Sequence, residues 1–211
     1  MLFDKTLAIL QTALGEPLPG AAAQELMTPR PRRDWPAGFN KARIRDAAGL
    51  LLLVPHHERA HVVLTLRAHS LDRHGGQVSL PGGVVERGET HELTALREAH
   101  EEIGLSVAVR ILGPLSPLDI AVSGFRLYPI VGATDTRPRF HPAAGEVDRV
   151  LEVAVDDLLE PGRVVWQSAT REGRSFEFPA FQFDDAEIWG ATAMVLAEFL
   201  ALLGWTGPSR A

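Results

Sequence analysis

The segment that most restricts the fold lies at residues 80–105, LPGGVVERGETHELTALREAHEEIGL, where a glycine-rich stretch runs into a strongly charged helix. Residues 81–83 interrupt the chain after an apolar run, and glycines allow a backbone to approach a ligand closely. Residues 90–103 have the best helical pattern in the chain, and Gly104 is a suitable stop. The prediction of the other helices and strands therefore starts from this loop and the glycine-terminated helix that follows it.

The two faces of this helix differ in character. At about 100° per residue, one arc holds Leu93, Leu96, Ala99 and Ile103, and the opposite arc holds Glu98, Glu101 and Glu102. Two like charges at ~4 Å repel by about 4 kcal/mol at an effective dielectric of ~20. The alternative is a solvated acidic face in which Arg97 pairs with Glu101. Three neighbouring glutamates on one helix face break the rule that like charges are kept apart. Such a departure favours a functional site over a solvated face, and a hard divalent cation such as Mg²⁺ would resolve the repulsion.

Periodicity places further elements on both sides of this segment. We expect helices at 3–14 and 187–203, a helical turn at 156–160, and strands at 47–55, 61–67, 106–115, 125–133, 149–155, 163–168 and 174–179. Strands broken by a few helices indicate an α+β or mixed α/β fold. We expect residues 1–40 to form a helix and a proline-rich connection, residues 41–203 the main domain, and residues 204–211 a frayed tail.

The composition excludes several classes of function. The net charge of −6 disfavours general binding to nucleic acid or to acidic membranes, because both need a basic surface. The absence of cysteine excludes disulfides, thiolate metal sites and a cysteine nucleophile. Residues 1–15 lack the basic region and cleavage site of a signal peptide, so we expect a cytoplasmic protein. A small anionic ligand held by a local arginine cluster remains compatible with this charge.

The charged segment closely resembles the Nudix box, G-x5-E-x7-R-E-U-x-E-E-x-G-U, where U is aliphatic. The fixed positions are filled by Gly83, Glu89, Arg97, Glu98, Glu101, Glu102 and Gly104, and the aliphatic ones by Ala99 and Leu105. The resemblance implies the Nudix fold, a mixed sheet sandwiched between helices. It also implies hydrolysis of a nucleoside diphosphate linked to another group, with Mg²⁺ or Mn²⁺ as cofactor.

The stretch just upstream is similar to the coenzyme A pyrophosphatase signature, L-L-T-x-R-[SA]-x3-R-x3-G-x3-F-P-G-G. The matching positions are Thr65, Arg67, Ala68, Gly76, Pro81, Gly82 and Gly83. Asp72 stands where the pattern has Arg, and Leu80 where it has Phe, although Arg73 offers a neighbouring charge. Coenzyme A or acyl-CoA is therefore the leading candidate substrate, with 3′,5′-ADP and 4′-phosphopantetheine as products.

The resemblance implies a role for each matching residue. Implied metal ligands are Glu98, Glu101, Glu102 and the carbonyl of Gly82, and implied holders of these carboxylates are Arg97 and Glu89. Candidate general bases are Glu98 and Glu101 within the box and Glu146 on a later loop, with Glu101 and Glu146 ranked first. Substrate contacts are expected from Arg67, Arg73, Gly76, Gly82, Gly83, Ser123 and Phe125, with the two arginines suited to a 3′-phosphate.

Two other functions stay open. The departures at Asp72 and Leu80 leave room for a Nudix hydrolase of ADP-ribose, NADH or another nucleoside diphosphate derivative. A non-catalytic nucleotide-sensing domain would be expected to have damaged metal ligands, and none is damaged. A homodimer is a candidate assembly. Among the aromatic side chains, Trp166, Trp189 and those of residues 176–183 are expected in the core, and the sequence does not single out one for stacking on adenine.

Overall fold

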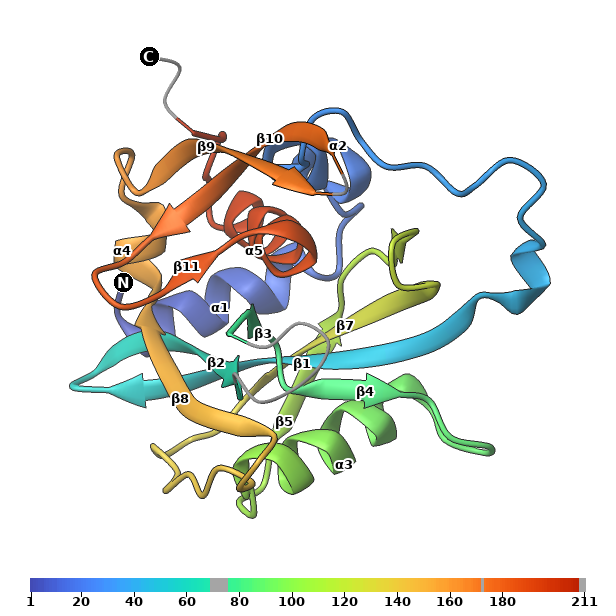
Figure 1. Cartoon of the computed structure of the whole chain (residues 1–211). Helices are drawn as coiled ribbons and strands as arrows, with labels where there is room; N and C mark the ends of the chain where they lie inside the picture. The colour runs from blue at the N-terminus through green and yellow to red at the C-terminus, as the bar shows by residue number, and fades with distance from the viewer. Residues whose placement is uncertain (69–75, 172, 209–211) are drawn as a thin grey trace.

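The computed structural model describes residues 1–68, 76–171 and 173–208, shown in Figure 1. The helices are α1 (Phe3–Ala13), α2 (Gly20–Gln24), α3 (His91–Ile103), α4 (Val155–Leu159) and α5 (Gly190–Leu202), with short 3₁₀ turns η1 (Glu25–Met27) and η2 (Lys41–Arg43). The strands are β1 (Arg45–His56), β2 (Arg59–Arg67), β3 (Val78–Ser79), β4 (Gly82–Val84), β5 (Arg110–Pro114), β6 (Leu118–Ile120), β7 (Phe125–Ala133), β8 (Val147–Ala154), β9 (Val164–Arg171), β10 (Arg174–Gln182) and β11 (Glu187–Ile188).

The strand β1 is the centre of a mixed sheet to which eight strands of the described chain belong. It runs parallel to β7 on one side and antiparallel to β2 and β4 on the other. The strand β8 pairs with β2, β3 extends β2, and β5 and β6 pair with β7. Residues 48–54 of β1 are buried without interruption, as expected for a strand covered on both faces.

Alternate side chains of β1 point into two separate hydrophobic clusters. Leu50 and Leu52 pack with α3 on one face of the sheet. Leu51 and Leu53 belong to the larger cluster on the other face, which includes α1 and α5. The helix α5 is mostly apolar and has nine consecutive buried residues, which is typical of a helix enclosed by other elements. The predicted mixed sheet between helices is therefore confirmed.

A second, three-stranded antiparallel sheet of order β11–β10–β9 lies beyond α5 (Figure 1). The predicted strands at 163–168 and 174–179 are confirmed, and they pair as an antiparallel hairpin in which both strands are longer than expected. Residues 187–203 were expected to be one helix, which is wrong at its start. Glu187 and Ile188 pair with β10, and the helix begins only at Gly190, whose φ is +64°.

Several short elements differ from the sequence prediction. The strand expected at 106–115 is confined to β5, and β6 follows as a separate strand. The glycine-rich stretch expected to interrupt the chain at 81–83 contains most of β4, β3 lies just before it, and the proline-rich connection expected within residues 1–40 contains α2. Strands of two or three residues are too short to show a period-2 signal, so their pairing depends on β1 and β2 already being in place.

The two ends of the described chain pack against the body. The carboxylate of Glu198 on α5 is fully buried and accepts hydrogen bonds from the N–H groups of Gly20 and Ser116 and from the amide of Gln24. Trp205 was expected in a frayed tail, but it is 8% exposed and its ring lies 5.9 Å from that of Phe181. Packed structure therefore continues past α5. No helix in the described ranges has the length and apolarity needed to cross a bilayer.

Candidate active site

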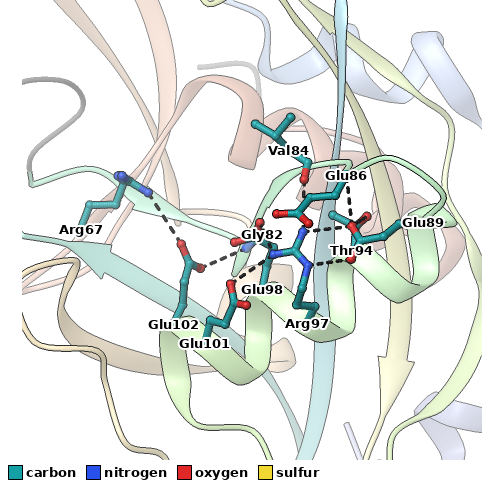
Figure 2. Close-up of polar contacts among 10 residues, drawn as sticks. All are labelled: Arg67, Gly82, Val84, Glu86, Glu89, Thr94, Arg97, Glu98, Glu101 and Glu102. Carbon is teal, nitrogen blue, oxygen red and sulfur yellow. Dashed lines mark hydrogen bonds and ion pairs between the residues drawn. The ribbon is translucent and has the colours of Figure 1, made fainter.

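The strand β4 brings two glycines against the side of α3. The N–H of Gly82 donates to Oε2 of Glu102 at 3.0 Å. A Cβ on Gly83 would lie 2.3 Å from Oε1 of Glu98, and a Cβ on Gly82 would lie 2.4 Å from the carbonyl oxygen of Ala48. The backbone around Gly82 therefore leaves no room for a side chain, and a side chain at Gly83 would displace the Glu98 carboxylate, so the two glutamates approach the backbone closely only because both residues are glycine (Figure 2).

The start and the stop of α3 follow the sequence prediction, and Ala99 and Ile103 are buried as expected, but the two edges of the buried face differ from the prediction. The hydroxyl of Thr90 accepts the N–H of Leu93, and Gly104 ends the helix in the left-handed region at φ 66°. Leu93 was expected on the apolar arc and is 55% exposed, whereas Glu102 was expected on the opposite arc and is 6% exposed. The buried face is rotated because residues 141–143 also contact the C-terminal turn, with the N–H of Ala143 donating to the carbonyl of Glu102.

Arg97 connects most of the acidic side chains of the site (Figure 2). Its Nε and Nη2 donate to the two carboxylate oxygens of Glu89 at 2.7 and 3.0 Å. Its Nη1 lies 2.8 Å from Oε1 of Glu98 and 3.1 Å from Oε2 of Glu101. Nη2 also donates to the carbonyl of Val84 at 3.2 Å, which ties α3 to β4. The guanidinium therefore fixes the positions of three carboxylates and one strand.

The environment of Glu89 favours its charged form. Hydrogen bonds from Arg97, together with one from the hydroxyl of Thr94 at 2.7 Å, lower the pKa of Glu89 to about 2. The N–H of Glu86 donates to the same carboxylate at 3.1 Å. A carboxylate with this many donors orients its partners and is unsuited to exchanging protons near neutral pH.

The environment of Glu102 disfavours its charged form, in contrast to that of Glu89. Burial raises the pKa of Glu102 to about 7, and the charges of Glu98 and Glu146 act in the same direction. The N–H of Gly82 and the charge of Arg67 oppose this rise. Nη1 of Arg67 lies 3.8 Å from Oε1 of Glu102, and its Nε is buried with no hydrogen-bond partner among the described residues. The carboxylate of Glu102 is thus held in a buried place where its charged form is disfavoured, with Arg67 at the edge of contact.

The donor chemistry of the site fits a hard divalent cation. In the described part of the chain, no three carboxylates or imidazoles already converge on one point. Arg97 binds Glu98 and Glu101, while Glu102 turns to the backbone of Gly82. The side chains nevertheless offer only oxygen ligands, and the desolvated carboxylate of Glu102 lies near the charges of Glu98 and Glu146. Oxygen-rich, electron-rich clusters of this kind are what Mg²⁺ and Mn²⁺ prefer.

The structure brings some of the remaining predicted residues to this cluster and leaves others away from it. Arg67 and Glu146 are adjacent, because the N–H of Ala68 donates to the carbonyl of Glu146 at 2.9 Å. The N–H of Gly76 donates to the carbonyl of Arg67, so this glycine closes the loop at the end of β2. Arg73 lies outside the described residues.

Ser123 and Phe125 lie at the other end of β1. Phe125 pairs with Arg45, whereas Gly82 pairs with Gly49, four residues or roughly 13 Å further along the strand. The guanidinium of Arg45 lies 4.2 Å from the centre of the Phe125 ring, and the hydroxyl of Ser123 donates to the carbonyl of Ile120. The structure therefore does not bring these two residues to the carboxylates.

Two contributors to the site were missed from the sequence. The carbonyl of Val84 accepts from Arg97, and the hydroxyl of Thr94 donates to Glu89. A backbone carbonyl has no sequence signal. Thr94 lies one helical turn before Arg97 and Glu98 and could have been found by asking which helix position faces Glu89.

A glycine-rich turn that enters a glutamate-lined helix beneath a mixed sheet defines the Nudix class of pyrophosphohydrolases. Sequence comparison shows the same: a family model described as NUDIX domain matches residues 43–169, and the chain belongs to this family. The chain is therefore a Nudix hydrolase, an enzyme class that acts on nucleoside diphosphate derivatives and generally uses divalent metal ions.

Two relatives carry the name Uncharacterized Nudix hydrolase NudL. The one from Yersinia enterocolitica is 34% identical over 174 residues, which cover 82% of this chain and 85% of the relative. The one from Citrobacter koseri is 32% identical over 162 residues, covering 76% and 84%. A solved MutT/nudix family protein from Enterococcus faecalis has the same fold, with a TM-score of 0.53 and 16% identity over 82% of this chain and 66% of that one.

Proposed function

We propose that the chain hydrolyses the diphosphate of coenzyme A or acyl-CoA, with Mg²⁺ or Mn²⁺, to give 3′,5′-ADP and 4′-phosphopantetheine. The observation that carries the proposal is the buried Glu102 between Arg67 and the Gly82 backbone, beside Glu98. Arg67 and Gly82 belong to the stretch that resembles the coenzyme A pyrophosphatase signature. The signature residues and the Nudix carboxylates thus line one place.

The proposed role of each residue follows from its environment in the site. A bound divalent cation would neutralise the diphosphate and make a coordinated water more acidic. Glu98, Glu101, Glu102 and the carbonyl of Gly82 are the proposed ligands. Arg97 and Glu89 keep these carboxylates in place through charge-assisted hydrogen bonds. Arg67 is the cation at the inner end of the site, where it binds the anionic substrate, and Gly76 and Gly83 allow close approach of the substrate to the backbone.

The general base is proposed to be Glu101 or Glu146. Glu101 is exposed and bound to Arg97, whereas Glu146 follows a loop and lies close enough to Glu102 to raise its pKa. Glu101→Gln and Glu146→Gln should each be compared with wild type in the pH dependence of kcat. The variant that has lost the base loses the acidic limb of the profile, whereas a lost ligand instead raises the metal concentration needed for activity.

The deciding experiment is a substrate panel with product identification. Coenzyme A, an acyl-CoA, ADP-ribose and NADH are incubated with the enzyme and Mg²⁺ or Mn²⁺, and the products are separated by chromatography. Coenzyme A should yield 3′,5′-ADP and 4′-phosphopantetheine with the highest kcat/KM of the set. If coenzyme A is inert while ADP-ribose is hydrolysed, the substrate assignment is wrong and the Nudix chemistry stands.

ADP-ribose or NADH is the second candidate substrate. Leu80 stands where the signature has Phe, and it is buried against Gly49 rather than offered to a ligand. A non-catalytic sensing domain is a further alternative, and it predicts nucleotide binding without turnover in the same panel. The homodimer and the cytoplasmic location stay predictions, and sedimentation of the purified chain checks the first of them.

A further inference from the structure

The small sheet has an aromatic layer that belongs to neither of the two hydrophobic clusters of the described chain. The rings of Phe178 and Trp189 have centroids 4.6 Å apart, and Phe176 lies 5.6 Å from Phe178 and 6.3 Å from Trp189. Phe178 is 5% exposed, whereas Phe176 and Trp189 are partly exposed. One buried ring thus supports two rings that reach the surface.

Polar side chains share this face of the small sheet. Gln167 is the cross-strand partner of Phe178, and Glu187 precedes Trp189 by two residues, so all four side chains point to the same side. The amide of Gln167 donates to Oε2 of Glu187 at 2.6 Å. A face that combines ring surface with an amide and a carboxylate suits a planar heterocycle with hydrogen-bonding edges better than it suits an alkyl chain.

Two contacts fix this face beside the reaction site. The hydroxyl of Thr192 donates to the carbonyl of Val78 at 3.0 Å, and the guanidinium of Arg149 binds Asp185 in the turn between β10 and β11. Val78 and Arg149 are both cross-strand partners of one residue of β2, Leu66. Figure 1 shows the small sheet and α5 above β3, in agreement with these contacts.

The next residue of β2 is Arg67, which pairs with Glu102. Trp189 precedes Thr192 by three residues, about one helical turn or roughly 5 Å. Each cross-strand step adds roughly 5 Å. The aromatic face is therefore joined to Arg67 by a short path of one helical turn, one hydrogen bond and one cross-strand pair. A ligand with its diphosphate at Arg67 would reach Trp189 with the group at its end.

We propose that Trp189, supported by Phe176 and Phe178, stacks on the nucleobase of the substrate. This inference rests on the proposed function only in that the substrate is a nucleoside diphosphate derivative. The nucleobase is assigned to the small sheet, and the diphosphate to α3, β4 and Arg67. Trp189 is thus a specificity residue that distinguishes nucleotides from other diphosphates and has no part in bond cleavage.

The first test measures binding without turnover. AMP is titrated into the metal-free enzyme while tryptophan fluorescence is recorded, and ribose 5-phosphate serves as the ligand without a base. AMP should quench the wild type and the Trp166→Phe variant, because Trp166 lies on the other face of the same sheet. The quench should be lost in Trp189→Phe, and ribose 5-phosphate should leave all three unchanged. An equal quench in Trp189→Phe overturns the proposal.

The second test separates stacking from fold. Trp189→Leu should raise KM about 10-fold for the nucleotide substrate, within the range for one base–aromatic stack, and leave kcat within about 2-fold. Trp189→Phe keeps an aromatic ring and should stay within about 3-fold of wild type in KM. An unchanged KM in the Leu variant overturns the base assignment even if hydrolysis is normal. AMP quenching at Trp189 without turnover of any diphosphate would instead refute the proposed hydrolysis alone.

If the Trp189→Leu variant fails to fold, as judged by circular dichroism, the fluorescence comparison of Trp189→Phe with wild type still tests the proposal. Quenching that survives in Trp189→Phe counts against the proposal, and quenching that disappears supports it. Trp166→Leu is the matched kinetic control, because it removes a solvent-accessible tryptophan from the opposite face of the same sheet. Its KM should remain that of the wild type.

Discussion

Substitution of Gly83 by alanine is expected to separate activity from stability. The new Cβ would lie 2.3 Å from Oε1 of Glu98, and ordinary contact begins at 3.4 Å, so the carboxylate must move by about 1 Å. The clashing group is the far end of a flexible side chain, so the free energy of unfolding should fall by less than about 1 kcal/mol. A displacement of ~1 Å at a reacting centre costs about 100-fold in rate, or roughly 2.7 kcal/mol of transition-state stabilisation.

Gly82 provides the contrasting variant. A Cβ there would lie 2.4 Å from the carbonyl oxygen of Ala48 and 2.6 Å from the Cα of Gly49, and backbone atoms of a central strand cannot move aside. Gly82→Ala should therefore cost about 2 kcal/mol or more and lower Tm by about 4–8 °C. Gly162 has open space around its Cα, so Gly162→Ala is the control that should change neither property.

The assay combines thermal unfolding with kcat and KM on the best substrate of the panel. Gly83→Ala should melt close to wild type and lose kcat, whereas Gly82→Ala should melt early. If folded Gly83→Ala retains kcat within about 3-fold of wild type, the position of Glu98 does not limit the reaction. The assignment of that carboxylate to the reacting centre would then have to be abandoned.

Three further outcomes are expected. Chelation with EDTA should abolish hydrolysis and added Mg²⁺ or Mn²⁺ should restore it, and turnover that persists in EDTA would contradict the metal assignment. Thr90→Ala removes the acceptor for the N–H of Leu93 and should lower the unfolding free energy by about 1 kcal/mol in denaturant titration. The hydrogen bond from Arg126 lowers the pKa of Asp119, so Asp119→Asn should destabilise by about 0.5–1 kcal/mol at neutral pH. That difference should fade as the pH falls below ~4, because the stabilisation is lost as the carboxylate is protonated, and a constant difference would refute it.

The sequence predicts the helix at the centre of the site well because its signals are local. Thr90 at the entrance, Gly104 at the exit and the spacing of Glu98 from Glu102 all act within a few residues. The long strands are equally clear, because residues 48–54 form an unbroken apolar run. These features need no knowledge of the neighbouring elements.

The parts that could not be predicted depend on packing between distant segments. A helical wheel with one apolar arc places Leu93 inside and Glu102 outside, but α3 also contacts residues 141–143 and β4, and the buried face rotates. Nothing local shows that Trp189 joins Phe178, because the strand pairing that creates this contact spans the β10–β11 turn. Family spacing indicated Phe125 but could not show how far it lies from the glutamates.

The parallel pairing of β1 with β7 has a consequence for the order of folding. Arg45 pairs with Phe125, 80 positions further along the chain, and the segments that hold α3 and β4 lie inside this closed loop. Joining such distant strands carries a large entropic cost before any contact compensates it, so this step is slow. The helix can form early, but the scaffold that aligns its glutamates is finished only when β7 has docked.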